Sequence, residues 1–356
     1  MKTTDLIKQH IEDSQPDKPT RGYLGMSAIG HDCSRKLWYD FRFCTMPHFD
    51  AISLLRFADG HNSEDITAQR IRDAIPEMEF LTHKQNGEQF GFIDIGGHFR
   101  GHCDGIGSGF PEFGSEWAIW EHKCSDRVNV NKLVRAIEKY GMDAALAEWN
   151  YNYYIQAQAY MHYGQLKHHL MTVSHSGSRD YVQVETKYDA HVAEGIVVQA
   201  KYIIATDTPP ERFRVDPEYY QCKWCDHSPI CHGDATPPPT CRTCIHVKPD
   251  LEGDKGYWFC HKHEFFIDMP TQLNGCDDHR YIPPVLDNWA DITGANENDG
   301  VTYQNKTNGE HFANGNGKTE YSSKELYKCN QPSLVGDALV EQMKGLYGAK
   351  IDAPSK

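Results

Sequence analysis

The sequence predicts a mixed α/β fold in which helices flank a central sheet, and three features of the chain support this prediction. Apolar residues recur at helical spacing from residue 53 to residue 75, where the pattern ends at Pro76. Two alternating apolar runs follow, separated by the pair Gly96-Gly97, which favours a strand hairpin. Further alternating runs come later in the chain, with helical patterns between them. The two patterns together predict one core built from both kinds of element.

The expected strands alternate apolar and polar residues, whereas the expected helices repeat apolar residues every three to four positions. We expect strands at residues 89–95, 98–105, 117–124, 169–174 and 181–186. We expect helices at residues 53–75, 148–163, 190–205 and 333–346. Near the C-terminus, residues 312–315 predict a strand or turn, and residues 321–326 predict a capped helix.

Prolines indicate where the chain divides into parts. They interrupt residues 206–230, which should therefore be irregular, and three consecutive prolines at residues 237–239 mark a linker. We expect a main domain at residues 1–235, a small cysteine-rich module at residues 236–285 and an accessory tail at residues 286–356. A chain of 356 residues has room for a core of about 200 residues beside such modules.

Composition and charge exclude some classes of protein. The formal net charge of -14 argues against binding nucleic acid through a broad basic surface, so any DNA contact should be local and assisted by a metal ion. No apolar run approaches the roughly 20 residues that a membrane helix needs. Residues 1–15 are polar and lack the pattern of a secretory signal. We therefore expect a cytoplasmic protein, in the host cytoplasm if phage encoded, that contacts no membrane.

The first chemical motif combines two carboxylates with one amine. Asp104 lies in the run Gly-His-Cys-Asp-Gly, and Glu121 and Lys123 lie in the run Trp-Glu-His-Lys on a neighbouring expected strand. The period of two puts Glu121 and Lys123 on one strand face, where Asp104 can join them. Two hard oxygen ligands suit Mg²⁺ or Mn²⁺, and Lys123 would orient or help to deprotonate a water. Alternating charges on a surface strand are the alternative interpretation.

Residues before and after this motif extend it. Glu64 or His61, on the first expected helix, would supply another metal ligand. Gln156 and Tyr160 are four positions apart on a later expected helix, so an amide and a phenol share one face. They would hydrogen-bond a DNA phosphate or the catalytic groups. The alternative for this pair is a tyrosine-rich core helix.

In chain order, these motifs resemble those of RecB-like exonucleases in the PD-(D/E)XK superfamily. The matching segments are Gly60-x3-Glu64, Gly101-x2-Asp104-Gly105, Glu121-x-Lys123 and Gln156-x3-Tyr160. The family's first motif often has a histidine where Glu64 stands in this chain. The resemblance implies a restriction-endonuclease-like core in residues 1–235, with a mixed central sheet flanked by helices. It also implies a catalytic set made of Asp104, Glu121, Lys123, Gln156 and Tyr160.

Twelve cysteines in a reducing compartment should be metal ligands or buried thiols rather than disulfides. The segment around Cys33 is similar to the one that holds the first cluster ligand in CRISPR-adaptation and AddB-type nucleases, and Cys222-x2-Cys225-x5-Cys231 is similar to their C-terminal triplet. The resemblance implies that these four cysteines bind a 4Fe–4S cluster that staples the domain. The alternative is a zinc site completed by His227 or His232, with Cys33 merely buried.

A second cysteine cluster lies in a segment too short to build its own core. Cys241-x2-Cys244 is followed by Cys260 and Cys276, and His279 is the substitute if Cys276 is not a ligand. Four thiolates predict a closed structural zinc site, whose role would be folding, DNA contact or docking of a protein partner. Free cysteines or a second iron-sulfur site are the alternatives.

The resemblance implies a metal-dependent DNA nuclease that hydrolyses phosphodiester bonds, acting as an exonuclease on single strands or DNA ends. The two-module organisation and the acidic charge incline us to a phage or mobile-element protein. The alternative function is a non-catalytic DNA-binding or assembly factor built on the same fold, which the negative charge favours slightly.

Overall fold

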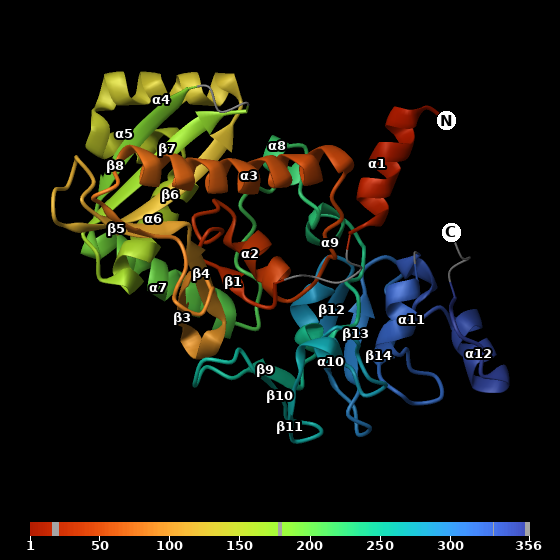
Figure 1. The fold of residues 1–356 in the computed structure, drawn as a ribbon. Helices are drawn as coiled ribbons and strands as arrows, with labels where there is room; N and C mark the ends of the chain where they lie inside the picture. Colours follow the sequence, from red (N-terminus) through yellow and green to blue (C-terminus); the bar gives the residue numbers. More distant parts are fainter. Residues whose placement is uncertain (16–20, 177–179, 330, 353–356) are drawn as a thin grey trace. The chain divides into compact units, whose positions relative to one another are not determined.

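The computed structural model describes residues 1–15, 21–176, 180–329 and 331–352, which form two compact units (Figure 1). The first unit consists of Met1–His31, His48–Ile95 and Phe99–Lys201. The second consists of Asp32–Pro47, Gly96–His98 and Tyr202–Lys356. Each unit therefore draws on segments that lie far apart in the chain. The division at residues 235 and 285 stays a prediction.

The first unit contains a mixed sheet with helices packed on it, as the sequence predicts (Figure 1). Its strands, in spatial order, are β2 (Glu79–Leu81), β5 (Gly105–Ser108), β6 (Trp117–Ser125), β7 (His168–His175) and β8 (Tyr181–Lys187). The central pair β6 and β7 is parallel, and the other neighbours are antiparallel. The predictions for residues 117–124, 169–174 and 181–186 are confirmed with small shifts at the ends.

A short second sheet in this unit joins β1 (Leu24–Gly25), β4 (Phe99–Cys103) and β3 (Phe90–Asp94). The predicted hairpin is confirmed, and its turn contains Gly96 with a φ of 64°. The prediction of one strand over residues 98–105 is wrong, because the chain leaves this sheet after Cys103 and enters the larger sheet at Gly105. Asp104 lies at the crossing between the two sheets.

The helices that begin in the first unit are α1 (Thr3–Asp13), α3 (Ala51–Ala74), α4 (Arg127–Tyr140), α5 (Met142–Trp149), α6 (Tyr151–Gly164) and α7 (Ala190–Ala205). The predictions for residues 53–75 and 190–205 are confirmed. The predicted start of the next helix at residue 148 is wrong, because Asn150 interrupts it. The Asn150 side chain accepts a hydrogen bond from the backbone N–H of Tyr153 and so caps α6.

Aromatic packing around Trp120 fixes the central strand β6 in the core. The Trp120 side chain is fully buried, its ring lies 5.2 Å from that of Phe80, and its indole N–H donates to Thr172 at 3.1 Å. Phe110 joins the same cluster. Burying a side chain of this size contributes roughly 2–3 kcal/mol. Glu121, the next residue in the chain, is therefore held in a fixed position.

The second unit holds short helices and two small sheets (Figure 1). The helices are α2 (Ser34–Phe41), α8 (Tyr220–Lys223), α9 (Ser228–Cys231), α10 (Met269–Gln272), α11 (Ser323–Lys328) and α12 (Ala338–Tyr347). One antiparallel sheet joins β9 (Val247–Pro249), β10 (Trp258–Cys260) and β11 (Phe265–Ile267). The other joins β12 (Ala290–Ala295), β13 (Val301–Asn305) and β14 (His311–Asn314).

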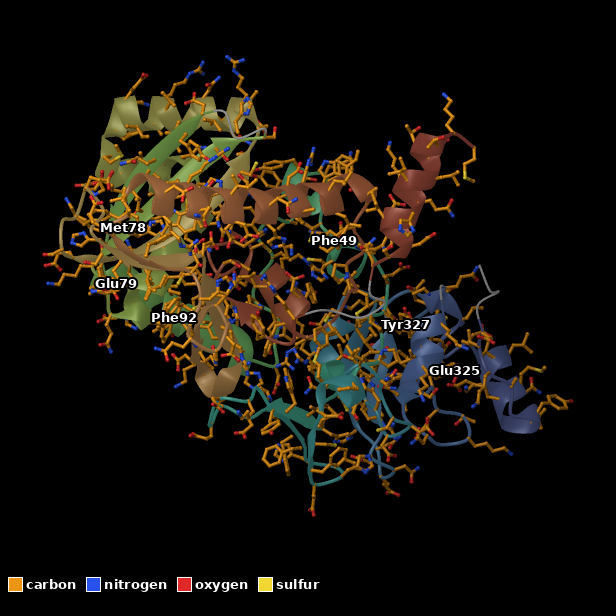
Figure 2. All side chains as sticks on the ribbon, in the orientation of Figure 1. Phe49, Met78, Glu79, Phe92, Glu325 and Tyr327 are labelled. Carbon is orange, nitrogen blue, oxygen red and sulfur yellow. The ribbon has the colours of Figure 1, made fainter. Side chains whose placement is uncertain are left out.

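The C-terminal elements match the sequence prediction in kind but not in every boundary. The strand near residue 312 and the helix capped by Ser322 are confirmed, and Figure 2 labels Glu325 and Tyr327 on that helix, α11. The predicted start of the last helix at residue 333 is wrong, because Pro332–Leu334 forms a short 3-10 turn and α12 begins at Ala338. Within the described parts of the chain, no helix has both the length and the apolar composition needed to cross a bilayer.

Candidate functional site

Asp104 and Glu121 lie together at the centre of the first unit. The backbone N–H of Asp104 donates to the Glu121 carboxylate at 3.2 Å, and the backbone N–H of His122 donates to Asp104 Oδ2 at 2.8 Å. The Glu121 side chain is 1% exposed and that of Asp104 is 12% exposed. The crossing between the two sheets is what aims Asp104 at β6.

Lys123 lies on the same face of β6 as Glu121, as the period of two predicts. Its ammonium nitrogen is 2.8 Å from Glu121 Oε2 and 3.8 Å from Asp104 Oδ2. His122 takes part in a different set of contacts, with the hydroxyls of Ser63 and Thr172. The structure therefore brings the two carboxylates and the amine of the predicted motif together.

Glu64 joins this group from helix α3. Burial raises the pKa of Glu64 to about 7, and the negative charge of Asp104 contributes to the rise. Burial and the charge of Asp104 likewise raise the pKa of Glu121 to about 8. Burial would lower the pKa of Lys123, but the two carboxylates outweigh it and hold that pKa above its ordinary value. Asp104 and Lys123 are therefore near enough to Glu64 for their charges to act on its carboxyl group.

The donors of this group fit a divalent cation. Carboxylates with raised pKa values repel one another in a buried place, and a bound cation relieves that repulsion. Carboxylate oxygens are the ligands that Mg²⁺ and Mn²⁺ prefer. Asp104, Glu121 and Glu64 are the residues that would hold the ion. His61, the other candidate, is exposed on α3 one turn before Glu64.

Helix α6 contributes the amide and the phenol that the sequence pairs. Gln156 Nε2 donates to Glu121 Oε2 at 3.0 Å and to the Tyr160 hydroxyl at 3.3 Å. Both side chains are buried, and the Tyr160 ring lies 5.6 Å from that of Phe92, which Figure 2 labels on β3. The pair therefore belongs to the core of the helix and also contacts the carboxylate group.

A basic group around His102, two residues before Asp104 in the chain, was missed by the sequence analysis. His102 is exposed on β4, and its pKa is lowered by burial of part of the ring and by the positive charges of Arg21, Lys84 and Arg100. The guanidinium of Arg100 also lies 5.7 Å from the ring centre of Tyr23. Arg100 and His102 are two positions apart on one strand, which was the signal available in the sequence. Such a group can bind phosphate within an acidic protein.

The cysteines of the predicted iron-sulfur set all belong to the second unit. Cys33 is the N-cap of α2, and its sulfur accepts a hydrogen bond from the backbone N–H of Lys36 at 3.4 Å. The pKa of Cys222 is raised by burial and by the charges of Cys33 and Cys231, and the charge of Cys33 also contributes to the raised pKa of Cys225. Cys33 is therefore within electrostatic reach of Cys222 and Cys225, and Cys231 is within reach of Cys222.

His227 was an alternative ligand for this set. Its Nε2 lies 2.7 Å from Asp40 Oδ1 and its Nδ1 lies 2.9 Å from the Thr45 hydroxyl. Both ring nitrogens are thus engaged within the fold, which speaks against His227 as a metal ligand. His232 lines a surface pocket together with Cys225.

The second cysteine set lines one cavity in the same unit. Cys241, Cys244, Cys260 and Cys276 all lie in its wall, and so does His279. That these residues bind one metal ion, and which metal it is, stays a prediction.

The chain was compared with known proteins. Neither a family model nor a curated protein sequence matches it. Among solved structures, the crystal structure of SSO0001 is 16% identical at a TM-score of 0.34, over 66% of this chain and 98% of that chain. An alkaline exonuclease from Laribacter hongkongensis, LHK-Exo, also solved in complex with dAMP, is 13% identical at a TM-score of 0.36, over 51% of this chain and 86% of that chain. A phage related exonuclease from Haemophilus somnus 129PT is 14% identical at a TM-score of 0.33, over 55% of this chain and 88% of that chain. These likenesses carry no function over to this chain, whose own side chains are the basis of the proposal below.

Proposed function

We propose that this chain is a metal-dependent DNA nuclease that hydrolyses phosphodiester bonds. The observation that carries the proposal is the meeting of Asp104, Glu121 and Lys123 at one point, where the Lys123 amine is 2.8 Å from Glu121 and 3.8 Å from Asp104. Phosphodiester hydrolysis needs an activated water and neutralisation of the charge that develops on the phosphate. The buried carboxylates of Asp104 and Glu121 can hold a metal ion that activates water. The ammonium group of Lys123 can neutralise charge on the phosphate.

Each residue of the group has a separate role. Asp104, Glu121 and Glu64 would hold Mg²⁺ or Mn²⁺, which when bound supplies Lewis acidity and lowers the pKa of a bound water. The raised pKa of Lys123 keeps its amine protonated, so Lys123 orients water and stabilises negative charge rather than acting as a base. Gln156 holds the Glu121 carboxylate in one orientation.

The substrate we propose is single-stranded DNA or DNA ends. Basic side chains near His102, contributed by Arg21, Lys84 and Arg100, would contact the phosphates that flank the scissile bond. This group is local, which suits a chain whose formal net charge is -14. Exonucleolytic cleavage is the finer part of the proposal.

We also propose that Cys33, Cys222, Cys225 and Cys231 bind a 4Fe–4S cluster. Four half-buried thiols, one at residue 33 and three within residues 222–231, offer the ligand set that such a cluster needs. The cluster would cross-link α2 to the proline-rich segment that carries α8 and α9, and so stabilise a region with little packing of its own.

The test is cleavage of end-labelled DNA, single-stranded and duplex, with Mg²⁺, with Mn²⁺ and with EDTA. We expect metal-dependent shortening from the ends, lost in Asp104→Asn and retained in Asp65→Asn, an exposed acidic neighbour of the site. Cleavage in EDTA, or equal cleavage by Asp104→Asn, would overturn the assignment. Binding of DNA without cleavage under any metal would favour the non-catalytic DNA-binding or assembly factor instead.

A further inference from the structure

The cavity lined by cysteines in the second unit brings together residues from three separate places in the chain. Cys241 begins a short 3-10 turn that Cys244 follows, Cys260 ends β10, and Cys276 comes after α10. All four cysteines lie in the wall of this one cavity, and His279 lies there with them.

His279 gives the cavity wall a buried nitrogen without a partner. The residue is 1% exposed, and its Nε2 lies 2.9 Å from the carbonyl oxygen of Thr240, so Nε2 carries the proton. Nδ1 then holds a lone pair, and it has no hydrogen-bond partner among the residues that the structure describes. Nearer the surface, ligand atoms of His263, Cys276 and Asp278 lie within 4.8 Å of one another. Thiols and imidazoles around one cavity are the donors that zinc prefers.

We propose that Cys241, Cys244, Cys260 and Cys276 bind one zinc ion, and that this ion fixes the turn that presents Arg242 to helix α2. The strands of the surrounding sheet, β9, β10 and β11, have three residues each. A sheet of that size cannot hold its own turns by burial of apolar surface. Ion binding therefore supplies the folding energy of this region.

Arg242 makes the connection because it stands inside the turn between the first two cysteines. Its guanidinium is buried and donates to the carbonyl oxygen of Phe41 at 2.7 Å and to Gln272 Oε1 at 2.7 Å. It also lies 4.0 Å from the ring centre of Phe43 and 4.8 Å from that of Trp258. The buried guanidinium of Arg242 can make these contacts only while the 3-10 turn keeps its conformation.

Helix α2 links this turn to the first cysteine set. Phe41 is the last residue of α2, and Cys33 is its N-cap. Arg42, the next residue, donates to the carbonyl oxygen of Arg242 at 3.1 Å. Zinc bound at the turn around Arg242 therefore stabilises α2, whose N-cap is Cys33.

The experiment measures zinc and iron in the full chain, purified without chelator and without added metal. We expect about one zinc per chain in the wild type and in Cys329→Ser, a half-buried thiol outside both sets. Zinc should fall about tenfold or more in Cys244→Ser and Cys260→Ser, and should stay in Cys222→Ser. Zinc that is absent from the wild type, or that survives Cys244→Ser, would overturn the site.

Cobalt substitution identifies the ligands independently of enzyme activity. Four thiolates give strong thiolate-to-cobalt charge-transfer absorption, and this should weaken in Cys276→Ser but not in His279→Gln. The opposite result would replace Cys276 by His279 as the fourth ligand and so contradict the four-thiolate assignment. If Cys276→Ser fails to fold, His279→Gln decides alone, because unchanged charge-transfer absorption supports the four-thiolate assignment and a changed spectrum contradicts it.

The second half of the proposal is tested by amide hydrogen exchange over residues 34–42. Exchange should become about tenfold faster or more when zinc is removed and in Arg242→Gln, although Arg242→Gln should retain zinc. Lys324→Gln, an exposed position in the same unit, should exchange like the wild type. Unchanged exchange in zinc-free protein would show that α2 does not depend on the ion.

Discussion

Gln156 on α6 donates a hydrogen bond of 3.0 Å to Glu121 on β6, and it reaches the same oxygen that Lys123 contacts at 2.8 Å. Two donors on one carboxylate oxygen leave little freedom for the side chain. Because Gln156 is itself buried, its amide cannot exchange this hydrogen bond for one to water. The orientation of Glu121 is therefore set before any metal ion or DNA binds.

Replacing Gln156 by methionine should lower the rate of DNA cleavage about 10- to 100-fold while the chain stays folded, because a hydrogen bond that orients a metal ligand is lost. The measurement is the single-turnover rate, with circular dichroism as the check on folding. Gln158→Met is the matched control. Gln158 is also buried on α6, but it bonds the backbone at Lys187 and Asp189. Equal rates in the two variants would contradict the role of Gln156.

Glu64→Gln should stabilise the metal-free protein at pH 8 by about 1 kcal/mol, after allowance for screening by solvent. The pKa of Glu64 is about 7 in the fold, above its ordinary 4.5, so ionisation costs stability as pH rises from 4.5 and the cost is complete above 7. The same variant should lose most of the rise in melting temperature that Mn²⁺ gives the wild type.

The control for this change is Asp65→Asn, the exposed residue next to Glu64. Thermal unfolding with and without Mn²⁺ at pH 8 separates the two positions. A Glu64→Gln variant that is destabilised without metal, yet stabilised by Mn²⁺ as much as the wild type, would remove Glu64 from the metal site.

Much of this site could be predicted from the sequence, because its signals are local. The alternation around Glu121 and Lys123 identifies both the strand and the shared face, and the spacing of four between Gln156 and Tyr160 identifies a helix face. Helix α4 could also have been predicted. Asp126 caps it, and buried apolar residues follow at helical spacing, at positions 130, 133 and 136.

The other parts of the site depend on which distant segments pair with one another. A repeating pattern of residues along the sequence carries no information about that pairing. Asp104 lies where the chain changes sheets, because β4 pairs with β3 whereas β5 pairs with β6. The basic group around His102 likewise combines Arg21 and Lys84 from segments far from it in the chain. The link from Arg242 to Phe41 spans 201 positions.

Acid should destabilise the fold through His169. Burial lowers its pKa to about 3 from 6.5, so the unfolded chain takes up a proton below pH 6.5 and the folded chain does not. Stability is therefore complete above pH 6.5 and is lost as the pH falls, by up to about 1.4 kcal/mol per pH unit. His169→Leu removes this dependence.

The measurement for His169 is the free energy of unfolding in urea at pH 7.5 and pH 5. The difference between the wild type and His169→Leu should change by about 2 kcal/mol between the two conditions, in favour of the variant at pH 5. Other groups titrate in both proteins, and their effects cancel in the difference. Parallel pH profiles would show that His169 has the same pKa in both states.

A buried ion pair near the C-terminus gives a test of the second unit. Lys344 on α12 lies 2.6 Å from Glu325 on α11, with exposed side-chain fractions of 3% and 4%. Lys344→Met should cost about 3–5 kcal/mol of stability, because it leaves a buried carboxylate without its partner. Adding Glu325→Gln should recover part of that loss. Lys187→Met, in a pair with side chains 67% and 63% exposed, should cost less than about 1 kcal/mol. Equal losses in the two single variants, measured by urea unfolding, would contradict this account of the pair.

The central claim is that the carboxylates and amine around Glu121 cut DNA, and the most direct test is the single-turnover rate of cleavage by the wild type and by Glu121→Gln in Mn²⁺. We predict a measurable rate for the wild type and a fall of about 1,000-fold or more for the variant, because the metal site loses a charged ligand and Lys123 loses its closest carboxylate. Lys132→Gln, on the exposed face of α4, should cleave as fast as the wild type. Equal rates for the wild type and Glu121→Gln would contradict the account.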